Sequence, residues 1–234
     1  MIYFRGCVVR EKLNNIEFAT MKILDKIGVD YDILENEECC GSFLLRTGFQ
    51  NDAIEVMKKT LKNIKDEKIL VSCAGCYNTL KNDYKKFLGA ELDVIHTSQL
   101  FNELIQKGKL KPMKSSLKVT YHDPCHLGRH CGEYQAPRNV IESTANFVEM
   151  KRNKFKSRCC GAGGGVKSAY PDTSLKIAQK RILDVEDIDA EFLVTSCSLC
   201  ILNLTSAVES LKKEHNYLKI IDLSELLLMG LNYE

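Results

Sequence analysis

Two sets of five cysteines are the residues of this chain best suited to chemistry. Each set consists of an isolated cysteine, an adjacent pair followed by glycine, and a CxxC element. The first set is Cys7, Cys39, Cys40, Cys73 and Cys76, and the second is Cys125, Cys159, Cys160, Cys197 and Cys200. Thiolates are the ligands that zinc and iron–sulfur clusters prefer. Five thiols gathered twice in the same order therefore indicate two metal-cluster sites.

Three familiar kinds of cysteine site do not account for the whole pattern. A zinc site takes four ligands, usually as two CxxC pairs, and so leaves one thiol of each set unused. A cubane ferredoxin cluster uses four cysteines, often in a compact CxxCxxC run that this sequence lacks. A redox dithiol needs only one CxxC. Five thiolates suit a cluster that is larger or more open than a simple cubane.

The composition predicts a core that forms without disulfide bonds. Hydrophobic residues make up 44% of the 234 residues and charged residues 27%, which is ordinary for a globular protein. The eleven cysteines are too few for a disulfide scaffold, and their odd number does not suit complete pairing. The thiols are therefore expected to be free to bind metal.

Charge and hydropathy exclude several other classes of protein. The net charge is +2, from 33 basic and 31 acidic residues that are well mixed, which argues against a nucleic-acid surface. The N-terminus lacks the features of a signal peptide, and no stretch reaches the ~20 apolar residues of a membrane span. We therefore expect a cytoplasmic chain, since thiols stay reduced in that compartment.

The elements that position the cysteines are themselves repeated. Residues 71–76 match 195–200 around the two CxxC elements, and residues 95–100 match 221–226. This self-similarity indicates duplication of one unit. The polar stretch 107–116 is the expected joint, so the predicted domains are 1–112 and 113–234.

Each half predicts an alternation of strands and amphipathic helices. The expected strands are 2–5, 31–34 and 68–71 in the first half, and 118–121, 147–150 and 192–195 in the second. Apolar residues at helical spacing, such as Ile16, Ala19 and Ile23, fill the segments between them. The predicted fold class is α/β, with two duplicated Rossmann-like βαβ halves that have parallel sheets and are related by a pseudo-twofold.

This topology explains how distant cysteines meet. Within each half the cysteines follow strands, or lie in loops after them, and the carboxyl ends of parallel strands share one edge where ligands bind. The CxxC elements are expected to open helices, where amide donors and the helix dipole stabilise thiolates.

At these positions the sequence resembles the CCG-domain family, the cysteine-rich iron–sulfur domain of heterodisulfide reductases. The resemblance covers nearly the whole chain, and both copies of the motif are complete. The residues that carry it are Cys39–Ser42 with Leu44–Gly48, His122–Arg129, Cys159–Gly165 and the two CxxC elements.

The resemblance implies that each motif holds a noncubane [4Fe-4S] cluster through its five cysteines. It implies further that the clusters face each other across the two halves and reduce the mixed disulfide of coenzyme M and coenzyme B. The ferredoxin-type segments of larger relatives are missing from this sequence. Electrons would then come from a ferredoxin-type iron–sulfur subunit and a flavoprotein subunit, with membrane contact only through a partner.

Several other residues are candidates for the site. His126 and His122 flank Cys125 and would donate a proton or a hydrogen bond, or would simply pack there as structural histidines. Cations near the ligands would balance cluster charge or form surface salt bridges, and Arg129, Lys167 and Arg46 would also bind an anionic substrate. The cations considered are Arg46, Arg129, Arg158 and Lys167.

Two further features receive interpretations of their own. The run Gly161–Gly165 does not complete a nucleotide-binding GxGxxG, so we interpret it as backbone that approaches the cluster closely. Cys131 has no counterpart in the first half and is predicted to be a buried or free thiol.

Three functions remain open from the sequence. The leading hypothesis is a catalytic iron–sulfur subunit that reduces a disulfide. The alternative is an electron-transfer subunit of a lactate, glycerol-3-phosphate, succinate or thiol:fumarate oxidoreductase. The third is a zinc-stabilised interaction module, and a mixed protein with one cluster and one zinc is also considered.

Overall fold

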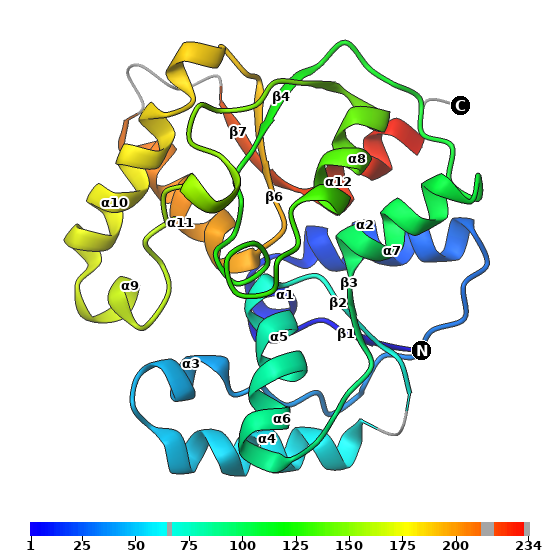
Figure 1. The fold of residues 1–234 in the computed structure, drawn as a ribbon, viewed down its shortest axis with the longest axis vertical. Coiled ribbons are helices and arrows are strands. Elements are labelled where there is room, and N and C mark those ends of the chain that lie inside the picture. Colours follow the sequence, from blue (N-terminus) through cyan, green and yellow to red (C-terminus); the bar gives the residue numbers. More distant parts are fainter. Residues whose placement is uncertain (65–66, 212–217, 232–234) are drawn as a thin grey trace.

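Two parallel β-sheets form the frame of the molecule (Figure 1). The computed structural model describes residues 1–64, 67–211 and 218–231. The first sheet has the order β1-β2-β3, with β1 (Ile2–Phe4), β2 (Ile69–Val71) and β3 (Val94–His96). The second has the order β5-β4-β6-β7, with β4 (Lys118–Tyr121), β5 (Asn146–Phe147), β6 (Phe192–Thr195) and β7 (Lys219–Asp222). Every pairing between these strands is parallel.

Helices connect the strands and cover the sheets. The helices before the joint are α1 (Cys7–Lys12), α2 (Asn14–Lys26), α3 (Ser42–Arg46), α4 (Gln50–Asn63), α5 (Ala74–Asn78), the π-helical turn η1 (Thr79–Asp83), α6 (Tyr84–Leu88) and α7 (Thr97–Gln106). Those after it are α8 (Gln135–Thr144), the 3-10 turn η2 (Lys154–Lys156), α9 (Val166–Ala169), α10 (Pro171–Leu183), the 3-10 turn η3 (Glu186–Ile188), α11 (Ser198–Ser210) and α12 (Leu223–Leu231).

This architecture confirms the predicted α/β class with parallel sheets and differs from it in detail. The strand expected at 31–34 is reduced to one bridge between Asp32 and Ile2, because the Arg5 guanidinium takes the carbonyl of Leu34 that a further ladder bond would need. The strand expected at 147–150 is present only as β5. The sequence prediction did not include β3 or β7, which form the outer edge of each sheet.

The same polar contact recurs in both halves and shows their equivalence. The Tyr3 hydroxyl lies 3.1 Å from Ser72 Oγ, and the Tyr121 hydroxyl donates to Ser196 Oγ at the same distance. Each tyrosine ends or nearly ends the first strand of its half, and each serine precedes a CxxC element. The pseudo-twofold relation is thus visible down to matched hydrogen bonds beside the cysteines.

The halves share their apolar interior. Helices α2 and α7 of the first half pack against α12 and α8 of the second, between the two sheets (Figure 1). One buried cluster contains Tyr3, Ile23 and Leu100 together with Val119 and Leu227. The domain boundary at 112/113 remains a prediction. Next to it, the Met113 N–H donates to the Gly230 carbonyl at 2.8 Å, which attaches this part of the joint to α12.

Among the residues that the structure describes, no helix is long and apolar enough to cross a membrane.

Candidate metal centre

Strand ends deliver four of the cysteines to the site. Cys7 opens α1 just after β1, and Cys125 follows β4. Cys73 and Cys197 follow β2 and β6, and each is the N-cap residue of the next helix. The prediction that the CxxC elements open helices is therefore confirmed. The exposed amide groups of a helix N-terminus favour the thiolate form of a cysteine at this position.

The adjacent cysteine pairs depend on the glycine that follows each of them. Gly41 and Gly161 have left-handed backbone conformations, with φ of +85° and +86°, which L side chains rarely adopt. Their N–H groups donate to the sulfur atoms of Cys39 and Cys159 over 3.5 and 3.4 Å. A left-handed turn thus points one amide back at the first thiol of each pair.

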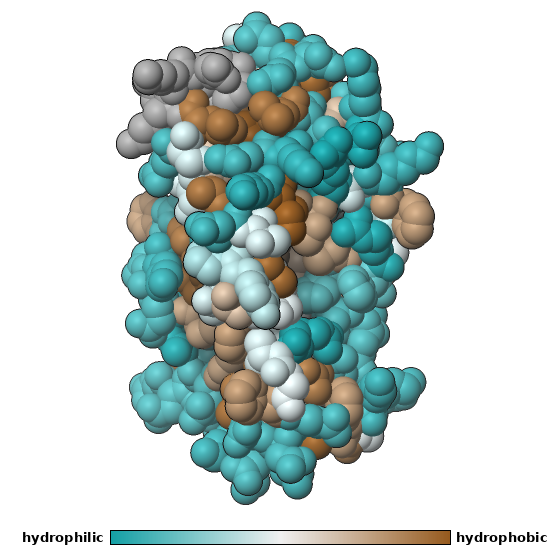
Figure 2. All heavy atoms as spheres, turned by 90° about the vertical axis from the view of Figure 1, so that its left-hand side faces the viewer, coloured by the Kyte–Doolittle hydropathy of each residue, from teal (hydrophilic) through white to brown (hydrophobic). Residues whose placement is uncertain are grey.

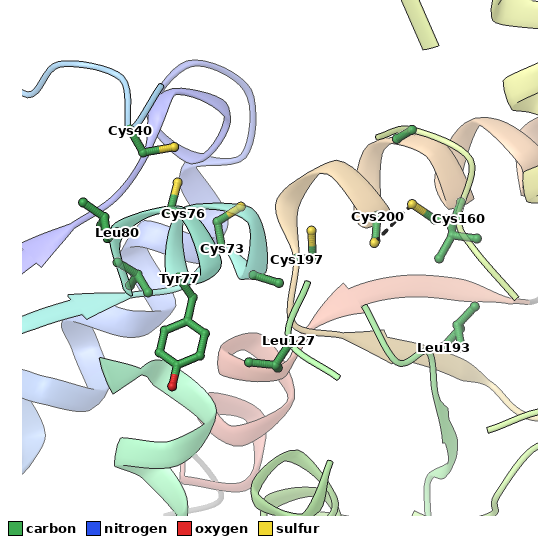
Figure 3. Close-up of a cluster of buried hydrophobic side chains, with 14 of the residues drawn as sticks. Cys40, Cys73, Cys76, Tyr77, Leu80, Leu127, Cys160, Leu193, Cys197 and Cys200 are labelled. Carbon is green, nitrogen blue, oxygen red and sulfur yellow. Dashed lines mark hydrogen bonds between the residues drawn. The ribbon is translucent and has the colours of Figure 1, made fainter. Parts of the chain in front are cut away.

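All ten thiols of the two motifs form one continuous row. The Cys200 thiol donates to the Cys160 sulfur over 3.2 Å. Figure 3 shows six of these side chains, which follow one another across the view in the order Cys40, Cys76, Cys73, Cys197, Cys200 and Cys160. Each thiol influences the pKa of the next in the order Cys7, Cys39, Cys40, Cys76, Cys73, Cys197, Cys200, Cys160, Cys159 and Cys125.

The contact between Cys73 and Cys197 joins the two halves of this row. Both residues are buried at the starts of α5 and α11, and their side chains are neighbours (Figure 3), with each thiol affecting the pKa of the other. The sequence predicted five thiols at one edge of each half. The structure brings these two edges together.

All eleven cysteines are free thiols, but they differ in exposure. Cys159 is exposed, and Cys7, Cys39 and Cys125 are half-buried. The buried thiols are Cys40, Cys73, Cys76, Cys160, Cys197 and Cys200. Each set therefore reaches from the interior, where the halves meet, to the solvent.

Three thiols of the two sets have a lowered pKa, which favours the thiolate: Cys39 and Cys73 in the first half and Cys159 in the second. Hydrogen bonds from the thiols of Cys40 and Cys7 lower the pKa of Cys39 to about 3, with help from the Gly41 N–H. Hydrogen bonds from Cys125 and Cys160 likewise lower the pKa of Cys159 to about 2. Metal binding requires deprotonated thiols, so each half contains at least one ligand whose surroundings favour the required form.

The donor set fits sulfur-ligated metal clusters. Each half offers five closely spaced sulfur atoms, and the space beside them is restricted: a Cβ built on Gly6 would lie 3.0 Å from Cys76 Sγ. Iron–sulfur clusters are held by thiolates and tuned by hydrogen bonds to sulfur. The residues that would hold the two clusters are those of the thiol row.

His122 lies directly against the second set. It is buried, and its Nδ1 accepts a hydrogen bond of 3.1 Å from Arg181 Nε. A ring nitrogen of His122 lies within 4.8 Å of the sulfur atoms of Cys160 and Cys200. Burial and the charge of Arg181 lower the pKa of His122, so the imidazole is neutral.

His126 extends from the second half to the first. A Cβ built on Gly75, inside the first CxxC element, would lie 3.7 Å from His126 Nδ1 and 3.6 Å from Cys73 Sγ. The ring also contacts His130 edge-on, with centroids 5.0 Å apart. Burial, together with the nearby His130 and Arg46, lowers the pKa of His126. The two predicted histidines thus lie near the thiols of different halves.

The predicted cations are all bound to other groups of the chain. Arg129 donates to the Ser157 carbonyl at 2.7 Å, close to Cys159, and Lys167 donates to Asn203 Oδ1 at 2.8 Å. Arg46 is paired with Asp83 at 2.5 Å and Arg158 with Asp184 at 3.2 Å. Their roles in substrate binding stay predictions.

Sequence reasoning missed two groups that hold the second site. Arg138 forms a bidentate, buried ion pair with Asp123 at 2.8 and 3.0 Å. Asp123 also accepts the N–H of Lys154, which fixes the segment before the Cys159–Cys160 pair. Asn203 donates to the Cys160 carbonyl at 2.6 Å. Asp123 belongs to the quoted motif, but Arg138 and Asn203 carry no sequence signal.

The glycine-rich loop of the second half meets the first half. A Cβ built on Gly165 would lie 2.6 Å from Thr47 Cγ2, so α9 and α3 approach each other through this glycine. Figure 2 views the molecule from the side of these two helices and shows hydrophilic and hydrophobic groups interspersed on that face. Cys131 lies near α5, with its sulfur 3.5 Å from Asn78 Oδ1.

Comparison with known proteins decides the family. The profile of the CCG family, described as a cysteine-rich domain, matches residues 1–81 and 119–205. The chain belongs to the CCG cysteine-rich domain family. Each of the two matched stretches contains a complete five-cysteine motif of its own.

Three curated relatives illustrate the range of this family. One component of a dihydromethanophenazine:CoB–CoM heterodisulfide reductase from Methanosarcina acetivorans is 44% identical over 226 residues, which are 92% of this chain and 55% of that protein. One component of a CoM/CoB fumarate reductase from Methanothermobacter marburgensis is 33% identical over 97% of this chain and 46% of its own length. An iron–sulfur protein from Methanocaldococcus jannaschii is 34% identical over 96% and 45%.

This CCG-family chain spans about half the length of the curated relatives it matches. Among solved structures, a glutamate racemase from Bacillus anthracis is similar, with 14% identity and a TM-score of 0.45 over 99% of this chain and 79% of its own.

Proposed function

We propose that this chain holds two noncubane [4Fe-4S] clusters and reduces a disulfide bond between them. The observation that carries the proposal is the continuous row of ten thiols, joined across the halves by Cys73 and Cys197. Two separate electron-transfer sites would not need to meet in this way. A reaction that produces two thiolates from one bond is suited to two neighbouring sites that can each take one sulfur.

The ligands in this proposal are the ten cysteines of the row. The first cluster takes Cys7, Cys39, Cys40, Cys73 and Cys76, and the second takes Cys125, Cys159, Cys160, Cys197 and Cys200. A zinc ion in one half is the competing assignment. It is disfavoured because tetrahedral zinc would leave one thiol of that half without a role.

The overall reaction is R–S–S–R′ plus two electrons and two protons, giving R–SH and R′–SH. When bound, the clusters supply electrons one at a time and iron atoms that take sulfur ligands. The sulfur–sulfur bond breaks, and each sulfur becomes a thiol after it receives one electron and one proton.

The chain itself positions the substrate and stabilises the thiolates that form. His126 is half-buried beside Gly75 and Cys73, where the two halves meet. Its lowered pKa leaves a neutral ring with one N–H, which can donate a hydrogen bond to a departing thiolate, while the two protons of the overall reaction come from solvent. The contact between Thr47 and Gly165 is a second place where the two halves touch.

The substrate class follows from the relatives. Two of them are named for coenzyme B and coenzyme M, so the mixed disulfide of these two thiols is the first substrate to test. Both halves of this disulfide carry acidic groups. Arg129, Lys167 and Arg46 are the cations proposed to meet them, and Arg129 is the most exposed of the three.

Among the described residues, the ten thiols leave no ligand set for a further cluster, so the electrons are proposed to reach this site from outside these residues. We propose a ferredoxin-type iron–sulfur subunit and a flavoprotein subunit as partners in a cytoplasmic complex, with any membrane contact made through a partner. The second candidate function is electron transfer alone, which is favoured by the fumarate reductase relative and by the exposed Cys159.

The test is disulfide turnover by the iron-loaded chain under anaerobic conditions. With a reduced viologen dye as donor, we expect two electrons consumed and two thiols formed for each molecule of mixed disulfide. Iron-loaded protein that oxidises the dye with an acceptor protein but releases no thiols would favour electron transfer instead.

A further inference from the structure

We propose that the His122 Nε2–H donates a hydrogen bond to sulfur in the second-half metal site and raises the reduction potential of the cluster there. Arg181 acts as the positioning residue that fixes this donor. The inference rests on the proposed clusters, and it concerns how the two sites differ rather than what they hold.

Arg181 determines which nitrogen of His122 carries the proton. A guanidinium group only donates hydrogen bonds, so His122 Nδ1 must be the acceptor of the 3.1 Å bond from Arg181 Nε. With Nδ1 occupied as an acceptor, the ring proton is on Nε2. A protonated Nε2 cannot ligate a metal, which makes His122 a donor to the site and excludes it as a further ligand.

The surroundings of His122 leave sulfur as the acceptor. Only 1% of the residue is exposed, and within the described part of the chain Nε2 has no hydrogen-bond partner. A ring nitrogen lies within 4.8 Å of both Cys160 Sγ and Cys200 Sγ. A buried donor without a partner is unfavourable, and thiolate or sulfide acceptors in the loaded site would satisfy it.

Arg181 is itself held in place by the chain. It is fully buried and donates to the Arg152 carbonyl at 2.8 Å and to Asp184 Oδ2 at 3.1 Å. These contacts leave the guanidinium little freedom to turn away from His122. The donor geometry is therefore built into α10 and the segment that precedes the cysteine pair.

The position that corresponds to His122 in the first half carries no such donor. The matched Tyr3–Ser72 and Tyr121–Ser196 contacts fix the correspondence, and the residue after each tyrosine is Phe4 in one half and His122 in the other. Both lie three residues before the first cysteine of the motif. Phe4 is fully buried and its ring cannot donate a hydrogen bond. The two five-thiol sites are thus inequivalent despite identical ligands.

A hydrogen bond to cluster sulfur favours the more negative, reduced state, so it raises the reduction potential. The experiment is a redox titration of the iron-loaded chain followed by electron paramagnetic resonance (EPR). We compare wild type with His122→Phe, which copies the first half, with His122→Gln, which keeps an N–H donor, and with Phe4→Leu as the control in the other half.

In His122→Phe we expect one of two midpoint potentials to fall while the other stays. At the same applied potential, the ratio of reduced to oxidised second cluster should drop about tenfold. This drop corresponds to a fall of ~59 mV in the midpoint potential of a one-electron couple. His122→Gln should recover most of this shift. Phe4→Leu should leave the His122-dependent potential unchanged, and all variants should keep the iron content of wild type.

Two results would overturn the inference while leaving the proposed function standing. One is a His122→Phe protein with full iron and both potentials unchanged. The other is loss of about half of the iron in both His122 variants, which would make His122 a ligand or a structural group. Wild-type protein that binds no iron would overturn the proposed function itself, and the inference with it.

Discussion

The thiols of Cys73 and Cys197 meet across the junction of the two halves. Each is the N-cap residue of the helix that follows an inner strand of its sheet, so the pseudo-twofold brings two equivalent helix starts face to face. This contact joins the two five-thiol sets into one row. The following predictions test which parts of the chain maintain it.

Removing one buried thiol should empty one half and spare the other. We expect Cys76→Ser and Cys200→Ser each to lose about half of the bound iron, because each residue belongs to one five-thiol set. Cys131→Ser is the matched control and should keep all of it, since its sulfur contacts Asn78 and Asn82. Iron analysis after anaerobic loading measures this, and a Cys131→Ser protein with reduced iron would contradict the ligand assignment.

The left-handed glycines should not tolerate side chains. A Cβ at Gly161 would lie 2.7 Å from the Ser174 carbonyl oxygen, whereas at Gly41 the nearest atom is Met57 Cγ at 2.8 Å. Backbone cannot move aside as a methionine side chain can. We therefore expect Gly161→Ala to be the more damaging change, with a loss of roughly 2–5 kcal/mol in the free energy of unfolding.

The variant Gly132→Ala serves as a control, because it introduces backbone strain without a steric clash. Gly132 has φ of +74° and no atom within 4 Å of the added Cβ, so only the backbone cost of ~1–2 kcal/mol applies. Anaerobic urea denaturation compares the free energy of unfolding of Gly161→Ala, Gly41→Ala and Gly132→Ala. Equal losses at Gly161 and Gly132 would show that the contact with Ser174 is unimportant.

The buried pair of Arg138 and Asp123 should stabilise the second half. Both side chains are 3% exposed, and breaking such a pair leaves an unpaired buried charge at a cost of ~3–5 kcal/mol. We expect Arg138→Met to lower the free energy of unfolding by this amount and to weaken iron binding near Cys159, because Asp123 also holds the Lys154 N–H.

The exposed pair of Lys151 and Asp187 provides the control for Arg138. These side chains are 86% and 68% exposed, so Lys151→Met should cost less than ~1 kcal/mol. Urea denaturation and iron content report both variants. Equal stability of the two would contradict a structural role for the buried pair.

Asp222 should make stability depend on pH. Burial raises its pKa to about 7, so the native carboxyl keeps a proton that the unfolded chain releases near pH 4. The free energy of unfolding should therefore fall as the pH rises from about 5 to about 7, by a few kcal/mol in all, and then level off.

Asp222→Asn should flatten this dependence. The amide oxygen can still accept the Ser224 N–H that Asp222 Oδ1 accepts at 2.9 Å, so the start of α12 is preserved. Denaturation of the loaded protein across this pH range compares the two chains. Parallel pH profiles would contradict the assignment to Asp222.

The sequence was sufficient where the signal was local or repeated. Apolar periodicity located the helices around Ile16 and Ile23, and the duplicated motif placed every cysteine after a strand or in a loop. It was insufficient where tertiary contacts decide. The segment after Asp32 leaves the sheet because Arg5 binds the Leu34 carbonyl, and no local pattern indicates that.

Orientation within the site also required the structure. The spacing around Cys125 makes both His122 and His126 candidate donors, with His126 favoured as the direct neighbour of this cysteine. Only the fold shows that His122 faces Cys160 and Cys200, while His126 crosses to Gly75 in the other half. The partners that fix them, such as Arg181, are distant in sequence and of ordinary type.

The most direct test of two clusters that handle thiols is an EPR measurement on oxidised, iron-loaded protein before and after a thiol is added. We predict roughly eight irons per chain, for two clusters of four, and a thiol-induced paramagnetic signal that broadens with ⁵⁷Fe. Tightly bound zinc without iron, or an iron protein whose spectrum does not respond to thiols, would contradict the account.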